Sequence, residues 1–477
     1  MKSRYKHILF GFIVAILLLT ALIENTGFIH LRFEPLKGFA STYQRPRFTL
    51  KTWMSAEFQD SLGAYLDNNT VFRAPLIRMY NEVNYRLFSK STAKTVVIGK
   101  NNQLFQTDYI REYNGEYFIG KELIRQRCER IKYIQDTLAR AGIDLLVVLA
   151  PGKASFFHEF IPDRYQQNKH GNTNYRCFKQ TCAELGINTL DLQACFMQMK
   201  DTASWPLYPT YGVHWSDYGM YLALDTFVNH ISQLTGKKVP ALTVSGIDKT
   251  HQPRGEDYDT GDLMNLMFPL NETTLAYPKF SNADTVTPEI NALIVGDSYI
   301  FHWLKYGLGE YLFKDYRFWY YNVMVYPEYY TQELYNYNLN IKEEIMKRDI
   351  IVLECAETFM YTAFWNFEDM AYKLFNPAYK ADGVFYYQND ITKDHDQFLE
   401  VYDAAVRKNK ALAAELLNEA QLRESTAPLG SVEFYIYSIK SDEQWLALIT
   451  RQAAEQGVPL EEAIRNNAIW MTENDEY

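Results

Sequence analysis

The sequence predicts an α/β fold, a parallel sheet flanked by helices, with an N-terminal transmembrane anchor and a helical C-terminal extension. Continuous apolar runs at 145–149, 292–295 and 350–353 are typical of strands buried on both faces of a parallel sheet. Segments with helical spacing of apolar residues separate these runs, as in repeated strand–helix units. The last part of the chain, 396–424 and 441–470, is charged and alanine-rich with a helical pattern.

Composition supports a folded, acidic protein. The 477 residues are 47% hydrophobic and 22% charged, which argues against a disordered chain and allows roughly two to three domains. The formal net charge is −10. Because an acidic surface repels phosphate groups, we expect neither nucleic acid nor an anionic membrane surface as the main partner.

The N-terminus has the pattern of a membrane-targeting segment. Lys2, Arg4 and Lys6 precede an apolar stretch over 8–23, and such cations keep the N-terminus in the cytoplasm. No Ala-x-Ala site follows the stretch, which favours an uncleaved signal anchor over 1–30 to a removed signal peptide. We therefore expect a single-pass protein of the cytoplasmic membrane with its body on the extracytoplasmic, periplasmic side.

Residues 31–94 are predicted to form a helical neck. Apolar residues from Phe58 to Leu66 follow helical spacing, and Pro75 is a favoured first-turn residue of a second helix. The α/β domain is expected over 95–390 and the C-terminal extension over 391–477. The domain begins with a hairpin over 95–105, in which Gly-Lys-Asn-Asn supplies the turn.

Strands and helices then alternate through the predicted domain. A helix with a stripe from Ile124 to Leu138 leads into the strand at 145–149, and a helix near 173–185 leads into a strand at 187–190. A further helix is expected over 219–234. The strands at 292–295 and 350–353 complete the sheet.

Two short segments predict a site for nucleophilic catalysis. Gly296-Asp297-Ser298 directly follows the strand at 292–295, where a serine on a tight turn can expose its hydroxyl at the carboxyl end of a parallel sheet. A serine hydroxyl needs a base within hydrogen-bond reach, and His214 in Tyr211-Gly-Val-His-Trp-Ser216 is the candidate. Taken alone, the tripeptide is more often a plain turn and the histidine more often a structural one. Polar residues also follow two other strands, at Lys153, Glu354 and Glu357.

Several segments in this order resemble a known family. They are Val96-Val-Ile-Gly-Lys-Asn-Asn-Gln-Leu-Phe105, Leu149-Ala-Pro-Gly-Lys153, His214-Trp-Ser216, Gly296-Asp-Ser298 and the strand region 349–357. The chain is similar, over about 35–360, to the SGNH-hydrolase-like domains of the alginate O-acetyltransferase family (AlgX/AlgJ type), also grouped with bacterial DHHW proteins. The order of histidine before serine fits this family, whereas ordinary SGNH esterases place the serine first.

The resemblance implies an SGNH-hydrolase-like fold and transfer of acetyl groups onto hydroxyls of an exported polysaccharide. Ser298 would carry the acyl group, His214 would act as base and then acid, and the backbone N–H of Ser298 would help to hold the oxyanion. No metal or other cofactor is implied. The implied partners are the polysaccharide and a multi-pass membrane O-acyltransferase that delivers the acetyl group. The residues expected around the oxyanion or the substrate are Gly296, Asp297, Lys153, Trp215 and Glu357.

One position departs from the family pattern. The family has aspartate two residues before the histidine, and this chain has Gly212. Loss of the acid that orients the imidazole can lower the rate about 10⁴-fold. Three explanations remain: another acid substitutes, with Asp217 and Asp191 nearest in sequence; a Ser–His dyad operates; or the domain binds polysaccharide without catalysis.

Three functions therefore follow from the sequence: a polysaccharide O-acetyltransferase, an acetyl esterase on the same residues, or a non-catalytic scaffold of an export or acetylation complex. Two further patterns are open. Asp257-x-Asp259-x-x-Asp262 has the oxygen spacing of a calcium loop but lacks its terminal glutamate, so we expect a solvated loop. Aromatic residues follow Ser298 and could form core or a sugar-stacking wall: Trp303, Tyr306, Tyr311, Phe318, Trp319, Tyr320 and Tyr321.

Overall fold

The computed structural model describes residues 5–8, 10–12, 14–15, 33–38, 43–166, 171–281 and 285–474. Much of the expected anchor over 1–30 lies outside these residues. Within them, no helix has both the length and the apolar character needed to cross a membrane. The chain forms two compact units, one of 1–107, 208–213 and 250–275, and one of 108–207, 214–249 and 276–477.

The first unit contains the predicted neck. Its helices are α2 (Leu50–Met54), α3 (Glu57–Asn69) and α4 (Arg73–Phe88), so the two expected helices are present. The expected hairpin is β1 (Val96–Ile98) paired with β2 (Leu104–Gln106), with Val97 opposite Phe105. The hairpin belongs to this unit together with the short helices η3 (Gly255–Tyr258) and α12 (Asp259–Leu263).

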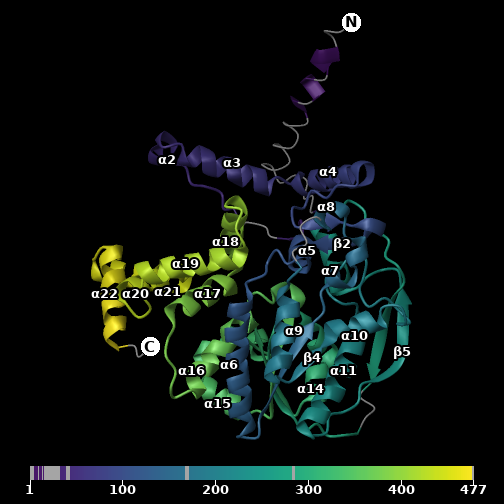
Figure 1. The fold of residues 1–477 in the computed structure, drawn as a ribbon. Helices are drawn as coiled ribbons and strands as arrows, with labels where there is room; N and C mark the ends of the chain where they lie inside the picture. The colour runs from purple at the N-terminus through teal and green to yellow at the C-terminus, as the bar shows by residue number, and fades with distance from the viewer. Residues whose placement is uncertain are drawn as a thin grey trace. The chain divides into compact units, whose positions relative to one another are not determined.

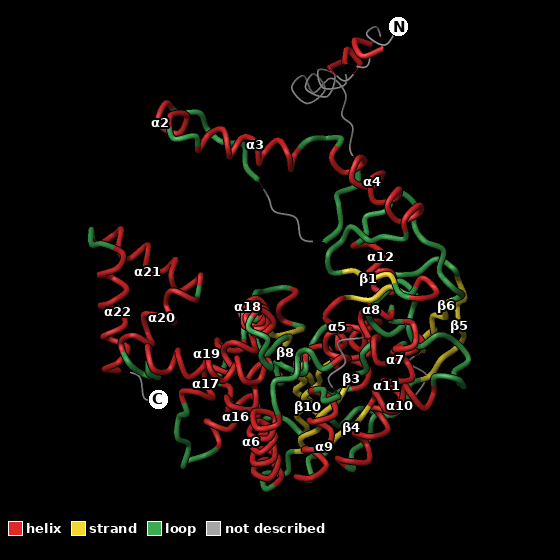
Figure 2. Tube along the Cα trace, turned by 45° about the horizontal axis from the view of Figure 1, so that its top comes forward, coloured by secondary structure: helices red, strands yellow, loops and turns green. Residues whose placement is uncertain are grey.

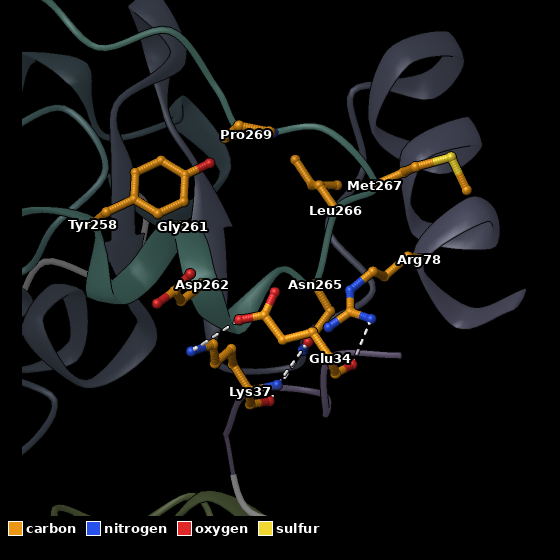
Figure 3. Close-up of a pocket in the computed structure, with 10 residues that line it drawn as sticks. All are labelled: Glu34, Lys37, Arg78, Tyr258, Gly261, Asp262, Asn265, Leu266, Met267 and Pro269. Atoms are coloured by element: carbon orange, nitrogen blue, oxygen red, sulfur yellow. Dashed lines mark hydrogen bonds and ion pairs between the residues drawn. The ribbon is translucent and has the colours of Figure 1, made fainter. Parts of the chain in front are cut away.

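A cavity of about 390 Å³ lies in the first unit (Figure 3). On one side of the cavity, the Asn265 side chain binds the backbone of Lys37. It accepts the Lys37 N–H at 2.7 Å and donates to the Lys37 carbonyl at 3.0 Å. Arg78 donates to the carbonyls of Glu34 and Pro35, each at 2.8 Å. The segment 33–38 is therefore held to the unit by backbone-directed hydrogen bonds.

The second unit is built on a six-stranded sheet in the order β4-β3-β10-β7-β8-β9. Figure 1 labels β4, the strand at one edge of this sheet. Its strands are β3 (Asp144–Ala150), β4 (Thr189–Asp191), β7 (Asn291–Gly296), β8 (Asp315–Tyr320), β9 (Met324–Tyr326) and β10 (Ile350–Ala356). All neighbouring pairs are parallel except β8 with β9. The predicted α/β architecture and its four sheet strands are confirmed.

Strands that the sequence did not predict are rich in aromatic or polar residues. β8 has the sequence Asp-Tyr-Arg-Phe-Trp-Tyr, and its aromatic residues suit a pleated, half-buried surface. The sequence also did not predict a separate two-stranded sheet formed by β5 (Thr243–Thr250) and β6 (Leu275–Ser281). Most of β5 alternates between half-buried and exposed residues. A search for continuous apolar runs misses such strands.

Helices cover both faces of the six-stranded sheet. One face packs, in a single apolar core, against α6 (Lys121–Ala139), α9 (Asn174–Leu185) and α16 (Phe367–Phe375). On the other face, α10 (Leu192–Met199) contacts β3, and α13 (Tyr299–Leu304) contacts α11 (Asp217–Thr235). Short helices over 153–166, 305–312, 328–346 and 357–366 connect these elements.

In the described part of the chain, six helices follow α16: α17 (Gly383–Lys393), α18 (His395–Arg407), α19 (Leu412–Thr426), α20 (Val432–Ser441), α21 (Glu443–Gln456) and α22 (Leu460–Asn474). Leu412 and Leu416 still pack into the core of the sheet. A second apolar core joins α17 and α19 with α20–α22, and Figure 2 shows these last three helices grouped together. The extension is therefore helical, as predicted, and its first helices belong to the main core.

One turn of left-handed helix follows β10. Ala363, Phe364, Trp365 and Asn366 have φ values of 46°, 57°, 52° and 65°. Non-glycine residues in this conformation cost roughly 1–2 kcal/mol each and rarely occur in a row. Burial of Ala363, Phe364 and Trp365 in the core holds the turn in place.

Candidate active site

Ser298 lies at the carboxyl end of β7, immediately before α13. Its backbone is in the ordinary right-handed region, at φ −63° and ψ −18°. The turn leaves no room for a side chain at position 296. A Cβ on Gly296 would stand 2.5 Å from a carboxyl oxygen of Glu354. Glycine is therefore required at 296 to let the Glu354 carboxyl lie under the turn.

His214 lies in the loop that leads into α11. Ser216 caps this helix, since its side chain accepts the Gly219 N–H at 3.0 Å and donates to the Pro206 carbonyl at 2.6 Å. The Ser216 hydroxyl thereby joins the first turn of α11 to the backbone at Pro206. Because Ser216 is the N-cap of α11, His214, two residues earlier, lies in the loop just before the helix.

The structure brings the two predicted residues together. His214 Nε2 lies 2.8 Å from Ser298 Oγ, although 84 positions separate them in the chain. Both residues are half-buried, whereas Asp297 and Tyr299 beside them are buried. A hydroxyl and an imidazole at this distance can exchange a proton when the hydroxyl attacks an acyl group.

A second histidine packs against the first. The rings of His214 and His302 are stacked with centroids 5.1 Å apart, and Tyr299 contacts the His214 ring at 5.0 Å. His302 is four residues after Ser298, on α13. Burial lowers the pKa of His302 well below its usual value, and the charges of His214 and Lys305 lower it further. His302 is therefore neutral at physiological pH and does not oppose a positive charge on His214.

Two buried carboxyl groups lie directly under the nucleophile turn. Asp297 accepts the N–H groups of Tyr299 at 2.9 Å and Ala356 at 2.8 Å, and its own N–H donates to Glu354 at 3.1 Å. Burial raises the pKa of both carboxyls, and the Asp297 charge raises that of Glu354 further. A hydrogen bond from Glu354 and the charge of His214 both act to lower the pKa of Asp297. We therefore assign the shared proton to Glu354 and the negative charge to Asp297.

The two acids that the sequence offered as substitutes for the missing aspartate bind other groups. Asp217 accepts hydrogen bonds from Lys305 at 3.1 Å and from the Tyr306 hydroxyl. Asp191 accepts the Tyr175 hydroxyl at 2.9 Å, pairs with Lys179 at 2.6 Å and caps α10. Both carboxylates therefore stabilise neighbouring helices and loops through these hydrogen bonds and ion pairs.

The structure also explains why glycine stands at 212. A Cβ on Gly212 would lie 2.7 Å from the Glu256 carbonyl oxygen and 2.8 Å from the Asp257 carbonyl. The segment that supplies these atoms is not the solvated loop we expected, because Asp257 is buried and Asp259 accepts the Val213 N–H at 2.9 Å. Within the described residues, no group of three or more His, Cys, Asp or Glu side chains could hold a metal ion. Backbone occupies the space that an aspartate at 212 needs.

Restoring the family residue should therefore harm the protein. We expect Gly212→Asp to destabilise the first unit by roughly 1–3 kcal/mol, because rigid backbone cannot yield to the new Cβ, and to leave acetyl transfer no faster. Thermal melting and an activity assay of the same sample measure both effects. Gly246→Asp is the matched control, since nothing lies within 4 Å of its Cβ position. A faster, equally stable Gly212→Asp protein would contradict this account.

Three other residues from the predicted site are buried. Trp215 is fully buried and packs against Tyr299 and Trp303, with ring centroids 4.8 and 5.8 Å away. Lys153 is fully buried at the start of α7 (Lys153–Phe156). Glu357 accepts the Ser155 hydroxyl at 2.6 Å. These side chains are part of the protein interior near the carboxyl edge of the sheet, and they are too buried to contact a polysaccharide.

Glu357 gives a prediction for stability against pH. Burial raises its pKa to about 7, opposed by the Ser155 hydrogen bond and the Arg176 charge. A pKa raised in the folded state gives stability that is complete below the unfolded value near 4.3 and is lost as pH rises to about 7. We expect Glu357→Gln to exceed the parent by roughly 3–4 kcal/mol in free energy of unfolding at pH 8, and by little at pH 4.5. Denaturant titrations at both pH values, with exposed Glu129→Gln as control, measure the difference; an equal difference at both would refute it.

The sequence did not predict a role in the site for Glu354 or His302. Glu354 was noted only as a polar residue after a strand, and its pairing with Asp297 depends on the adjacency of β10 and β7. His302 carried a weak signal, since four residues after Ser298 is one helical turn. Neither spacing alone distinguishes these residues from ordinary core positions.

Part of this chain is similar to known proteins. Residues 96–294 match the family model described as SGNH hydrolase-like domain, acetyltransferase AlgX; the match includes His214 and ends before Ser298. The probable alginate O-acetylase AlgJ of Pseudomonas putida is 23% identical over 203 residues, 42% of this chain and 47% of that protein. The protein of the same name from Azotobacter vinelandii is 25% identical over 202 residues, 42% of this chain and 49% of that protein.

The chain spans about half the length of these curated relatives. Among solved structures, the O-acetyltransferase domain of Pseudomonas putida AlgJ is 18% identical, with 56% of this chain and 91% of that chain covered and a TM-score of 0.38. The family match and the relatives confirm the resemblance to the SGNH-hydrolase-like alginate O-acetyltransferase family and the SGNH-like α/β fold of the matched region.

Proposed function

We propose that this chain is an O-acetyltransferase that places acetyl groups on hydroxyls of an exported or cell-surface polysaccharide, through an acyl-enzyme on Ser298. One observation carries the proposal: the 2.8 Å contact between Ser298 Oγ and His214 Nε2 at the carboxyl edge of a parallel sheet. The match of 96–294 to an acetyltransferase family model, and relatives named as probable alginate O-acetylases, support the choice of acetyl transfer.

In the first half-reaction, Ser298 Oγ attacks the carbonyl carbon of an acetyl donor while its proton passes to His214 Nε2. The tetrahedral intermediate places its negative charge on the former carbonyl oxygen, which the Ser298 backbone N–H helps to hold. His214 then returns the proton to the departing group of the donor. Acetyl remains bound to Ser298 as an ester.

In the second half-reaction, a sugar hydroxyl takes the place of the departing group. His214 Nε2 accepts its proton as the oxygen attacks the acetyl ester, and the proton passes to Ser298 Oγ when the ester bond breaks. Serine and neutral histidine are regenerated. Water in place of the sugar hydroxyl would make the protein an esterase on the same residues.

Asp297 supplies part of what the absent aspartate would give. Its carboxylate lies one residue before the nucleophile, and the charge of His214 acts to lower the Asp297 pKa. Because the interaction is mutual, the carboxylate also stabilises the imidazolium that forms in each half-reaction. This contribution acts through the protein and needs no aspartate at 212.

The acetyl donor and the location are part of the proposal. We expect a multi-pass membrane O-acyltransferase to deliver acetyl across the membrane, and the signal anchor over 1–30 to hold the body on the periplasmic side. The charged residues before the apolar stretch support this orientation.

A product-partition assay tests the function. The full chain in detergent micelles is supplied with p-nitrophenyl acetate and a mixture of oligosaccharides, and acetate and acetylated sugar are both quantified. We expect acetylated sugar from the parent and only the background rate from Ser298→Ala. Free acetate alone would indicate an esterase, and equal rates in both proteins would indicate a non-catalytic scaffold.

A further inference from the structure

A second cavity is lined by residues that follow strands at the carboxyl edge of the sheet. Its volume is about 850 Å³, within the range of small-molecule sites. Tyr321 follows β8 and Phe359 follows β10, and both line the cavity. Since β7 lies between β10 and β8, the Ser298 turn stands between the two strands that lead into the cavity wall. The Tyr321 N–H donates to the Gly296 carbonyl at 3.0 Å, which ties this wall to the turn.

Aromatic rings form one wall of the cavity. Tyr321 and Trp365 have ring centroids 4.7 Å apart, and Phe359 lies 5.9 Å from Tyr321 and 6.1 Å from Trp365. Tyr321 and Phe359 are half-buried, so part of each ring faces the cavity. Such rings pack against the C–H face of a pyranose and bury it from water. Of the other six aromatic residues named from the sequence, Trp303, Phe318 and Trp319 are buried in the core, Tyr306 is exposed, and Tyr311 and Tyr320 are half-buried.

Amide side chains hold the adjoining wall in a fixed arrangement. Asn322 donates from its side chain to the Trp365 carbonyl at 3.2 Å, and Asn336 donates to the Asn322 carbonyl at 2.6 Å. All three residues line the cavity. A wall whose groups are already hydrogen-bonded loses little entropy when a ligand binds.

Backbone strain is concentrated around the same cavity. Tyr321, Asn322, Trp365 and Asn366 all line it and have φ between 52° and 65°. Non-glycine residues keep this conformation only where the surrounding structure imposes it, and such residues cluster at ligand sites. The strain therefore points to a binding surface and not merely to a gap in the packing.

The charges that line the cavity do not suit an anionic sugar. Asp108 and Asp394 contribute carboxylates, and among the described lining residues Lys393 is the one lysine or arginine. Lys393 is already paired with Asp390 at 2.9 Å. The other groups near the cavity that can carry positive charge also face a carboxylate: His395, which lines it, lies 3.7 Å from Asp108, and Arg111 pairs with Asp108 at 3.6 Å. A carboxylate on the ligand would have to compete with Asp108 and Asp390 for these groups, which costs affinity.

From these observations we infer that the cavity binds the acceptor chain, and that this chain is an uncharged polysaccharide with hydroxyl or acetamido groups, not a polyuronate. Aromatic faces pack on the sugar rings, and the amides and Asp108 contact their polar groups. The role as acceptor site rests on the proposed function, because it requires Ser298 to carry acetyl; the binding of uncharged sugar does not.

Binding is tested on the full chain in detergent micelles by isothermal titration calorimetry with three probes: cellohexaose, the hexamer of N-acetylglucosamine, and a mannuronate hexamer. We expect at least one uncharged hexamer to bind at least about tenfold more tightly than mannuronate, a difference of about 1.4 kcal/mol. Val323→Lys, at a rim position that is 39% exposed, should weaken that binding about tenfold. Val406→Lys, at a 60% exposed position in a different cavity, should not. Tighter binding of mannuronate, no binding of either uncharged hexamer, or equal effects of the two lysine variants would overturn the inference.

A kinetic measurement separates this inference from the proposed function. Phe359→Ala removes part of the aromatic wall and should raise the KM for the uncharged acceptor about tenfold. Val406→Lys, in a different cavity, should leave both that KM and nitrophenol release in water unchanged. Ser298→Ala should lose both reactions. If Ser298→Ala changes neither reaction, the proposed function fails while the calorimetry still decides the sugar class. If Phe359→Ala folds and leaves the acceptor KM unchanged, the acceptor site is not this cavity.

Discussion

Replacing Ser298 by alanine should lower kcat/KM for acetyl release from p-nitrophenyl acetate by about 10⁴-fold or more. The hydroxyl is the atom that forms the acyl ester, and no other group can take over the bond that it makes. Loss of a nucleophile or of its base costs up to about 10⁶ in kcat in serine hydrolases, and the residual rate comes from binding and the oxyanion site.

His214→Ala should lower the rate by a similar factor, and the double variant should be no worse than either single one, because serine and histidine act as one unit. Stopped assays with varied substrate give the three values of kcat/KM. Ser425→Ala and His158→Ala are matched controls, since both residues are exposed and lie on other elements. Losses that multiply in the double variant would show that the two residues do not act together.

Asp297→Asn and Glu354→Gln should differ sharply, although each exchanges a buried carboxyl for an amide. The Asp297 carboxylate accepts N–H groups from Tyr299 and Ala356, and an asparagine amide must turn its NH₂ toward one of them. That leaves a buried donor unsatisfied and removes a charge-assisted bond, at a cost of roughly 2–4 kcal/mol. Because the charge near His214 is also lost, kcat should fall in whatever fraction remains folded.

Glu354→Gln should be tolerated, because the glutamine NH₂ replaces the carboxyl proton toward Asp297 and its oxygen still accepts the Asp297 N–H. The raised pKa of Glu354 means that the parent gives up stability as pH rises above the unfolded value near 4.3. The glutamine variant should therefore match the parent near pH 4.5 and exceed it at pH 8. Denaturant titrations of both variants at the two pH values test this. Equal losses in both variants would contradict the assignment of the proton to Glu354.

The sheet could be predicted because its inner strands are continuous apolar runs. Strands β3, β7 and β10 are almost entirely buried, and that burial demands the residues that the pattern recognises. The aromatic strand β8 carries Tyr and Arg at half-buried positions, so no apolar run marks it. The extension was predicted as helical, but sequence periodicity does not reveal which core a helix joins; Leu416 of α19 packs into the main core.

The candidate site was predictable only in part, for similar reasons. Ser298 and His214 stand next to local signals, a strand end and a helix cap, and could be proposed from the sequence. The Asp297–Glu354 pair and the cavity at Trp365 depend on which strands are neighbours and on an unusual backbone turn, neither of which a spacing encodes. The crowding at Gly212 is likewise a property of backbone from another segment.

Mass spectrometry of the acyl-enzyme tests the central claim most directly. The full chain is mixed with p-nitrophenyl acetate, quenched in acid within the first turnover, and digested. We predict that the peptide containing Ser298 gains one acetyl group, that the fragment ions assign it to Ser298, and that His214→Ala greatly reduces it. An unmodified Ser298 peptide during active turnover, or acetyl found on another residue in both proteins, would contradict the account.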